Sequence, residues 1–274
     1  MNLEKILKKA SLSLYPTPFE LNSHEIDKIL LWRTRYFLRK GNFNIFSKIE
    51  IETTTECNRA CSYCPNSEYK REKRLMPEEL FKKIIFDLEV MDYVGVVAPH
   101  LYGEPLLDTR LPELISFTRQ KLPRARIWIY SNGDYLNEEV YSRLRESGVN
   151  LFIVTGHEGR KPEKFLEWFE KSVKGERKGI VYRRLGIKAN RGNASAGEYC
   201  KMQRCIIPSN NVAVNVEGKF LACCNDFFGE FVFGDLRNES LSQVWCSKDY
   251  QDFRIDSRKG KFYLDICKKC GFYV

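Results

Sequence analysis

The chain has 274 residues, is 43% hydrophobic and carries a formal net charge of +9. This length fits one large domain or one medium domain with small additions. No apolar run reaches the roughly 18–20 residues that span a bilayer, and the amino terminus lacks a signal-peptide core, so we expect a cytoplasmic protein with no membrane partner. The charge indicates either a solvated lysine-rich surface or an anionic partner, and no nucleic-acid-binding module is visible.

Residues 1–46 are predicted to form a mostly helical extension. Apolar residues recur at helical spacing over residues 25–39, and Ser23 is a candidate N-cap. Pro16 and Pro18 separate this helix from a first basic segment. We expect this extension to pack against the main domain.

Strands and amphipathic helices then alternate over residues 47–195. The predicted strands are 48–53, 94–100, 126–130, 151–154 and 179–183, and the predicted helices are 77–90, 111–120, 137–147 and 161–174. Such repeats indicate an α/β domain with a parallel sheet and helices outside it. About five or six repeats are too few for a closed eight-fold barrel.

Three cysteines follow the first predicted strand. Cys57, Cys61 and Cys64 have the spacing C-x3-C-x2-C. Three thiolates can hold three irons of a 4Fe–4S cluster and leave the fourth iron open for a ligand. A structural zinc site instead prefers C-x2-C pairs and four closing ligands. The loop therefore predicts an iron–sulfur cluster with one open position.

This spacing, with Tyr63 before the last cysteine, resembles the radical S-adenosylmethionine (AdoMet) enzymes. The resemblance implies that the three cysteines hold the cluster, that AdoMet binds the open iron, and that Tyr63 lies near the adenine. It also implies that the main domain is a partial (β/α)6 barrel, open on one side for substrate.

Two further loops resemble AdoMet-binding elements of this family. Gly103-Glu104-Pro105 resembles the G-G-E-P element that binds the methionine amine, with Tyr102 in place of the first glycine. Ser131-Asn132-Gly133 resembles the T-N-G element that contacts the ribose or carboxylate. Both sequences also suit ordinary turns, but each follows a predicted strand, at the edge where α/β folds build their sites.

Two residues are candidates for work on the substrate. Many relatives carry the element Ser-x-Asp at this position, and in this chain His157 replaces the acid. His157 is either a proton acceptor or a hydrogen-bonded structural residue. Arg191, in an N-R-G element that resembles one in relatives, either orients substrate or AdoMet or is a loop cation.

A second cysteine group lies in residues 196–274, which we expect to form a small α+β domain. Its form, C-x12-G-x4-C followed by C-x2-C, resembles the twitch domain, the short form of the SPASM domain. The resemblance implies an auxiliary 4Fe–4S cluster held by Cys205, Cys223, Cys267 and Cys270. A hairpin of strands 211–216 and 219–222 would bring the first two together. A zinc site with the same four ligands is the alternative.

The resemblance implies that AdoMet is cleaved to a 5′-deoxyadenosyl radical, which takes a hydrogen atom from a small-molecule substrate. The short twitch form most resembles inosamine dehydrogenases, which favours oxidation of a sugar, cyclitol or similar metabolite. The alternative is maturation or epimerisation of a ribosomal peptide, with a thiol such as Cys200 as hydrogen donor; an inert buried thiol is the other interpretation of Cys200. A flavodoxin or ferredoxin would supply electrons, and the sequence does not indicate an oligomeric state.

Overall fold

In the computed structural model, residues 34, 36–38, 41, 44–172, 179–185, 192, 200–201 and 203–272 are described. Residues 34 and 36–38 are helical, as expected, and most of the predicted extension lies outside the described residues. The first half of the chain supplies β1 (Lys48–Ile51), β2 (Val96–Ala98), β3 (Arg126–Ser131), β4 (Leu151–His157) and β5 (Ile180–Leu185). The intervening helices are α3 (Glu78–Val90), α4 (Leu111–Lys121), α5 (Glu138–Ser147) and α6 (Glu163–Lys171).

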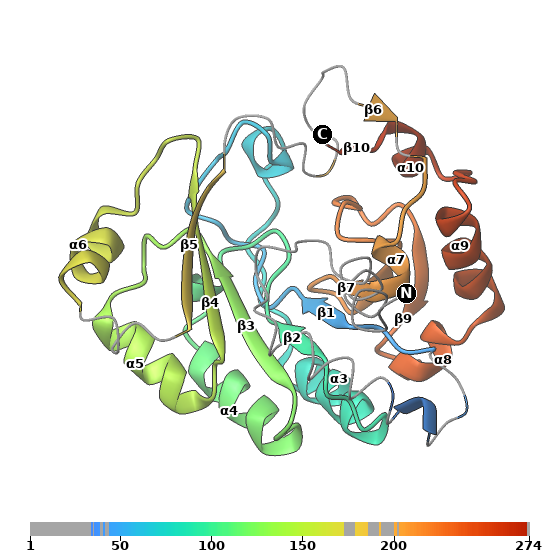
Figure 1. Cartoon of the computed structure of the whole chain (residues 1–274), viewed down its shortest axis with the longest axis horizontal. Coiled ribbons are helices and arrows are strands. Elements are labelled where there is room, and N and C mark those ends of the chain that lie inside the picture. The colour runs from blue at the N-terminus through green and yellow to red at the C-terminus, as the bar shows by residue number, and fades with distance from the viewer. Residues whose placement is uncertain are drawn as a thin grey trace, which may run out of the picture.

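The nine elements predicted over this region are all present, with their ends shifted by up to three residues. Strands β1 to β5 are parallel, and the helices follow one another along the outer side of the sheet (Figure 1). Two helices begin where the sequence predicts because their first turns suit a helix start. Glu78 and Glu79 follow Pro77 at the start of α3, and the side chain of Asn137 accepts a hydrogen bond from the backbone of Val140 in α5.

The C-terminal part extends the same sheet. It contains α7 (Ile207–Asn210), β7 (Asn211–Val214), β8 (Lys219–Leu221), β9 (Val232–Asp235), α8 (Leu241–Trp245), α9 (Lys248–Arg258) and α10 (Asp265–Lys269). Two short strands, β6 (Cys200–Lys201) and β10 (Gly271–Phe272), pair with each other. The strand order of the large sheet is β5-β4-β3-β2-β1-β7-β8-β9, and β7 is parallel to β1. The predicted hairpin is therefore present as β7 and β8, and its first strand is a direct neighbour of β1.

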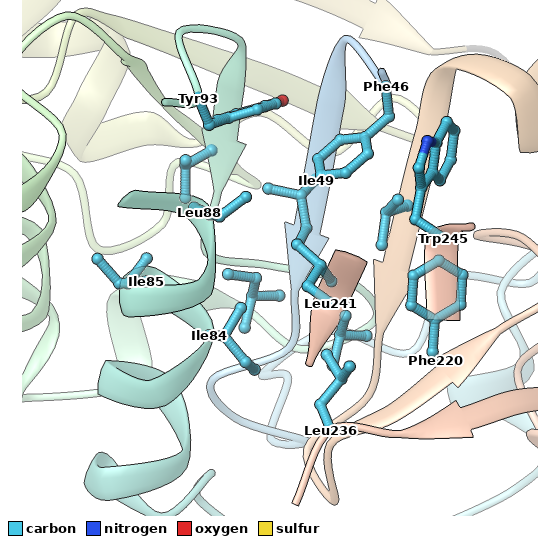
Figure 2. Packing of buried hydrophobic residues seen from close by; sticks show 14 of the residues in the cluster. Phe46, Ile49, Ile84, Ile85, Leu88, Tyr93, Phe220, Leu236, Leu241 and Trp245 are labelled. Atoms are coloured by element: carbon cyan, nitrogen blue, oxygen red, sulfur yellow. The ribbon is translucent and has the colours of Figure 1, made fainter. Parts of the chain in front are cut away.

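Both parts of the chain share one hydrophobic core. Ile49 of β1 and Phe46 before it face Ile84 and Leu88 of α3 (Figure 2), and Ile51 belongs to the same cluster. Trp245 of α8 contacts the Phe46 ring at a centroid distance of 5.0 Å, and Leu241 belongs to the same cluster. The C-terminal part is thus packed on the first strand of the sheet. Within the described ranges, no helix is long and apolar enough to cross a membrane.

Candidate active site

The first cysteine group lies in the loop between β1 and the short helix η1 (Pro65–Ser67). Cys61 and Cys64 are buried and Cys57 is half-buried. Burial raises the pKa of Cys57 to about 11, and the nearby Glu104, Cys64 and Cys61 raise it further. Because Cys61 and Cys64 affect the pKa of Cys57, the three thiols lie close together. Burial also raises the pKa of Cys61, so Cys57 and Cys61 are protonated without metal, and iron would displace their protons on binding.

A cluster and a single metal ion require different arrangements of their ligands. Among the described residues, no three cysteine, histidine or acidic side chains form a group that could hold one metal ion. In a 4Fe–4S cube each cysteine binds a different iron, so its ligands surround the cube and do not converge on one point.

The loop after β2 lies directly against the backbone of the cysteine loop. The backbone N–H of Glu104 donates a hydrogen bond to the carbonyl of Glu56 at 2.8 Å. A Cβ atom added at Gly103 would lie 2.0 Å from the carbonyl oxygen of Thr54, a contact that real side chains do not make. Glycine is therefore required at position 103, because only a residue without a side chain permits this approach.

Glu104 also joins the loop after β2 to the loop after β3. Its buried carboxylate accepts hydrogen bonds from the backbone N–H groups of Asn132, at 2.8 Å, and Leu106, at 3.2 Å. Burial raises the pKa of Glu104 to about 7, while hydrogen bonds from Asn132, Ser131 and Leu106 oppose that rise. Three residues predicted from two separate motifs, Glu104 from one and Ser131 and Asn132 from the other, thus lie in contact.

Asp134 holds the other side of the cysteine loop. Its carboxylate accepts hydrogen bonds from Arg59 Nε at 2.7 Å and from Asn58 Nδ2 at 2.8 Å. Asn58 in turn accepts a bond from Asn132 Nδ2 at 2.8 Å. Asp134 was not predicted from the sequence. Its position directly after Ser-Asn-Gly, at the end of a strand, could have indicated that it belongs to the site.

The end of β4 contacts the cysteine loop through His157, its last residue, and Glu158, the residue that follows it. The Tyr63 hydroxyl is hydrogen-bonded to His157 Nδ1, and the two rings lie 5.9 Å apart between centroids. Glu158 accepts a hydrogen bond from the backbone N–H of Ser62 at 2.7 Å. His157 therefore lies at the predicted site, in contact with the residue that the sequence places near the adenine. Glu158 was missed by the sequence analysis.

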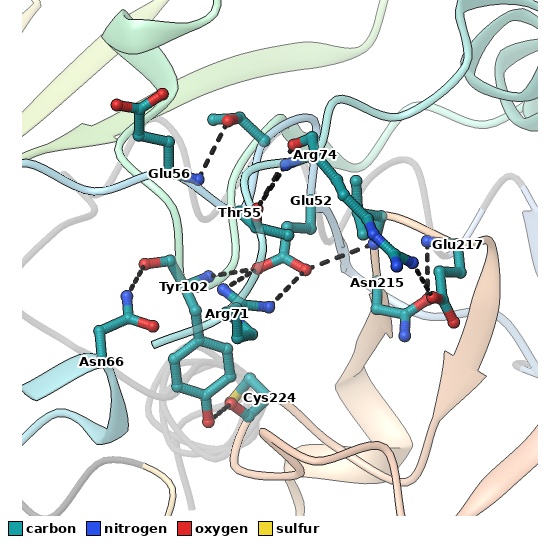
Figure 3. Close-up of polar contacts among 12 residues, drawn as sticks. Glu52, Thr55, Glu56, Asn66, Arg71, Arg74, Tyr102, Asn215, Glu217 and Cys224 are labelled. Carbon is teal, nitrogen blue, oxygen red and sulfur yellow. Dashed lines mark hydrogen bonds and ion pairs between the residues drawn. The ribbon is translucent and has the colours of Figure 1, made fainter. Parts of the chain in front are cut away.

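A buried carboxylate, Glu52 at the end of β1, connects four segments (Figure 3). Arg71 makes a two-pronged ion pair with it, with N–O distances of 2.8 and 3.0 Å. The backbone N–H groups of Tyr102, at 3.2 Å, and Val216, at 3.3 Å, also donate to this carboxylate. The segment after η1, the loop after β2 and the β7–β8 turn are thereby fixed to one side chain, which was not predicted from the sequence.

Tyr102, which replaces the first glycine of the G-G-E-P element, reaches toward the second cysteine group. Its hydroxyl donates a hydrogen bond to the carbonyl of Cys224 at 2.8 Å (Figure 3). Its ring contacts Phe227 edge-on at 4.8 Å. The departure from the family pattern thus joins the loop after β2 to the C-terminal part.

The four cysteines of the second group also lie near one another. Burial raises the pKa of Cys267 to about 12, and Cys205 and Cys270 raise it further; burial likewise raises the pKa of Cys223, with contributions from Cys224, Cys205 and Cys267. Asn225, which the sequence analysis did not predict, donates hydrogen bonds to two of these sulfurs. Its backbone N–H lies 3.4 Å from Cys223 Sγ and its Nδ2 lies 3.5 Å from Cys270 Sγ.

Two predicted residues cannot be placed in this site. Arg191 lies outside the described residues. The backbone of Cys200 lies in β6, opposite Phe272 of β10, but its side chain is not among those the structure describes.

Comparison with known proteins assigns the class. Residues 51–178 match the model of the radical SAM superfamily, and residues 205–271 match the SPASM model, an iron–sulfur cluster-binding domain. The chain belongs to the radical SAM superfamily and is an oxidoreductase that uses AdoMet and two iron–sulfur clusters. These matches confirm the predicted family, fold class and cofactors.

The relatives agree with this assignment over most of the chain. The AdoMet-dependent 2-deoxy-scyllo-inosamine dehydrogenase of Niallia circulans is 36% identical over 238 residues, 83% of this chain and 93% of that protein. A crystal structure of BtrN with AdoMet and 2-DOIA matches with a TM-score of 0.77 and 36% identity, covering 82% of this chain and 92% of that one. A structure of anSMEcpe with bound AdoMet, at 11% identity and a TM-score of 0.51, covers 83% and 89% of the two chains and shares the fold.

Replacing Gly103 by alanine should separate the loop after β2 from the cysteine loop, because the new Cβ would collide with the Thr54 carbonyl. A misplacement of about 1 Å in a positioned group costs on the order of a hundredfold in rate. We expect a loss of this size in AdoMet cleavage by the reconstituted enzyme. The exposed Thr109→Ala serves as the control, and wild-type cleavage by Gly103→Ala would contradict this account of the loop.

Proposed function

We propose that this enzyme oxidises a hydroxyl-bearing carbon of a polyhydroxylated ring, such as a cyclitol or a sugar. The observation that carries the proposal is the 36% identity, over 83% of the chain, to an enzyme named for dehydrogenating 2-deoxy-scyllo-inosamine. The proximity of the cysteines within each of the two groups supports it, since a two-electron oxidation by a radical route needs an acceptor for the second electron.

The first cluster would be held by Cys57, Cys61 and Cys64. When bound and reduced, it supplies one electron that cleaves AdoMet to a 5′-deoxyadenosyl radical, which removes a hydrogen atom from the substrate. Glu104, fixed by backbone N–H donors, would accept hydrogen bonds from the methionine amine, and Gly103 lets its loop approach the cluster. Ser131, Asn132 and Tyr63 would complete the AdoMet site.

The second cluster would be held by Cys205, Cys223, Cys267 and Cys270. Four protein ligands leave no open iron, so this cluster would hold or move electrons and would not bind substrate. Asn225 supports this assignment because hydrogen bonds to ligand sulfurs tune the potential of a cluster. A flavodoxin or ferredoxin is the proposed external electron donor.

His157 is the proposed proton acceptor, since it lies beside the cysteine loop. Arg191 stays protonated, so its proposed role is to orient substrate. Cys200 would take part in the reaction only if a thiol returned a hydrogen atom to the substrate radical. The proposed organisation is an extension of residues 1–46, a barrel domain of residues 47–195 and an auxiliary domain of residues 196–274.

The substrate class can be tested with deuterium-labelled 2-deoxy-scyllo-inosamine, labelled at each hydroxyl-bearing carbon. The reconstituted, reduced enzyme should transfer one deuterium to 5′-deoxyadenosine and form a ketone, as read by mass spectrometry. The Cys200→Ala variant should give the same product, because oxidation needs no hydrogen donor. AdoMet cleavage without deuterium transfer from this or a related cyclitol would contradict the proposal.

The pKa of Glu104, about 7, predicts a pH-dependent AdoMet affinity. The ionised carboxylate accepts hydrogen bonds from the amine, and this form is lost as the pH falls through 7. Affinity should therefore fall about tenfold between about pH 8 and about pH 6. Anaerobic calorimetry on the reconstituted enzyme measures this.

The Glu104→Gln variant should bind AdoMet weakly and show a smaller pH dependence. A pH profile that is the same in both proteins would show that Glu104 does not control binding.

A further inference from the structure

The face of β1 opposite the hydrophobic core carries charged residues. Ile49 and Ile51 point into the core, so the alternating side chains of Lys48 and Glu50 lie on the other face of the sheet. Strands of a parallel sheet are normally apolar on both faces. A buried charged pair at this position is an exception that calls for an explanation.

This pair is buried and ordered by ionic contacts. Lys48 Nζ lies 2.9 Å from Glu50 Oε1, and His100 Nε2 lies 3.6 Å from the same oxygen. Burial disfavours the charge on Glu50, but the attraction of Lys48 and His100 outweighs it and lowers the pKa of Glu50. The attraction of Glu50 likewise outweighs burial at Lys48 and raises the pKa of Lys48. Both side chains are therefore charged at neutral pH.

Two acceptor atoms on this face have no hydrogen-bond partner among the described residues. They are Glu50 Oε2 and Asn211 Oδ1, and both residues are more than nine-tenths buried. Asn211 lies opposite Lys48 in the β1–β7 register, so its side chain lies on the same face, one row from Glu50. A buried acceptor atom without a hydrogen-bond donor is energetically unfavourable. A ligand that supplies the missing donor is one of the few ways to account for such an atom in a folded protein.

The position of this cluster relates it to the AdoMet loops. His100 lies at the end of β2, three residues before Gly103, and its ring contacts that of Tyr130 at 4.5 Å. Tyr130 directly precedes Ser131 in β3. The neighbours of Glu50 in the adjacent strands are alanines, Ala98 and Ala213, whose side chains are short and carry no polar group that could bond to its carboxylate.

We propose that Lys48, Glu50, His100 and Asn211 form an inner-face cluster that binds hydroxyl groups of the substrate ring. One hydroxyl would donate to Glu50 Oε2 and a second to Asn211 Oδ1. The Lys48–Glu50 pair is neutral as a whole, so it favours a neutral hydroxyl donor over an ammonium group. This inference rests on the proposed function and names the groups that recognise its polyhydroxylated substrate.

Binding requires a small rearrangement, because Glu50 Oε2 is shielded in this structure. The related BtrN has been solved both with AdoMet and 2-DOIA and in an open conformation, and this chain matches the two with TM-scores of 0.77 and 0.67.

The test is anaerobic calorimetry of 2-deoxy-scyllo-inosamine binding to the reconstituted enzyme with AdoMet. The variant is Lys48→Met with Glu50→Gln, which removes both charges together and leaves no unpaired buried ion. Loss of a hydrogen bond to a charged group should raise the dissociation constant of the ring roughly tenfold to a hundredfold. The AdoMet dissociation constant should change less than about twofold. Lys219→Met with Asp235→Asn, which removes an ion pair between β8 and β9, is the matched control.

A second variant covers the case in which the double replacement fails to fold. Asn211→Leu has a similar volume and removes an acceptor that lacks a partner, so the fold should tolerate it while ring binding weakens several-fold. Unchanged ring binding in a folded variant would overturn the inner-face cluster and leave the proposed function standing. If the wild-type enzyme binds neither this ring nor an inositol, the proposed substrate class fails, and the inner-face cluster fails with it.

Discussion

The ion pair between Glu52 and Arg71 is the contact on which the rest of the site depends. A carboxylate that is completely buried is costly unless its oxygens are satisfied, and here a guanidinium and two backbone N–H groups satisfy them. Those donors come from three segments that are distant in the sequence. Glu52 therefore sets the positions of the segment after η1, the loop after β2 and the β7–β8 turn relative to β1.

The same arrangement explains why the two cysteine groups belong to one folded unit. β7 pairs with β1, and the core of the C-terminal part continues that of the main sheet. Tyr102 adds a direct link, since it lies in the loop after β2 and its hydroxyl donates a hydrogen bond to the carbonyl of Cys224, the residue after Cys223. The positions of the two groups are thus coupled through the first strand and do not depend on a flexible linker.

Local patterns allowed much of this to be predicted. Cysteine spacing, strand–helix alternation and the motifs around Glu104 and Asn132 depend on neighbouring residues. The predicted strands and helices are present, and the two motifs follow β2 and β3. Glu52, Asp134 and Asn225 were missed because each is a single polar residue whose partners lie far away in the sequence. Pairing of β7 with β1 was missed for the same reason, since a strand's apolar pattern predicts that it is buried but does not name its neighbour.

The central claim is that Cys57, Cys61 and Cys64 hold the cluster that cleaves AdoMet. The most direct measurement is iron content together with 5′-deoxyadenosine production, on anaerobically reconstituted protein given a strong reductant. The wild type should hold about eight irons per chain and produce 5′-deoxyadenosine, while replacement of these three cysteines by alanine should leave about four irons and no product. Wild-type protein that holds its full iron content and never cleaves AdoMet would contradict the account.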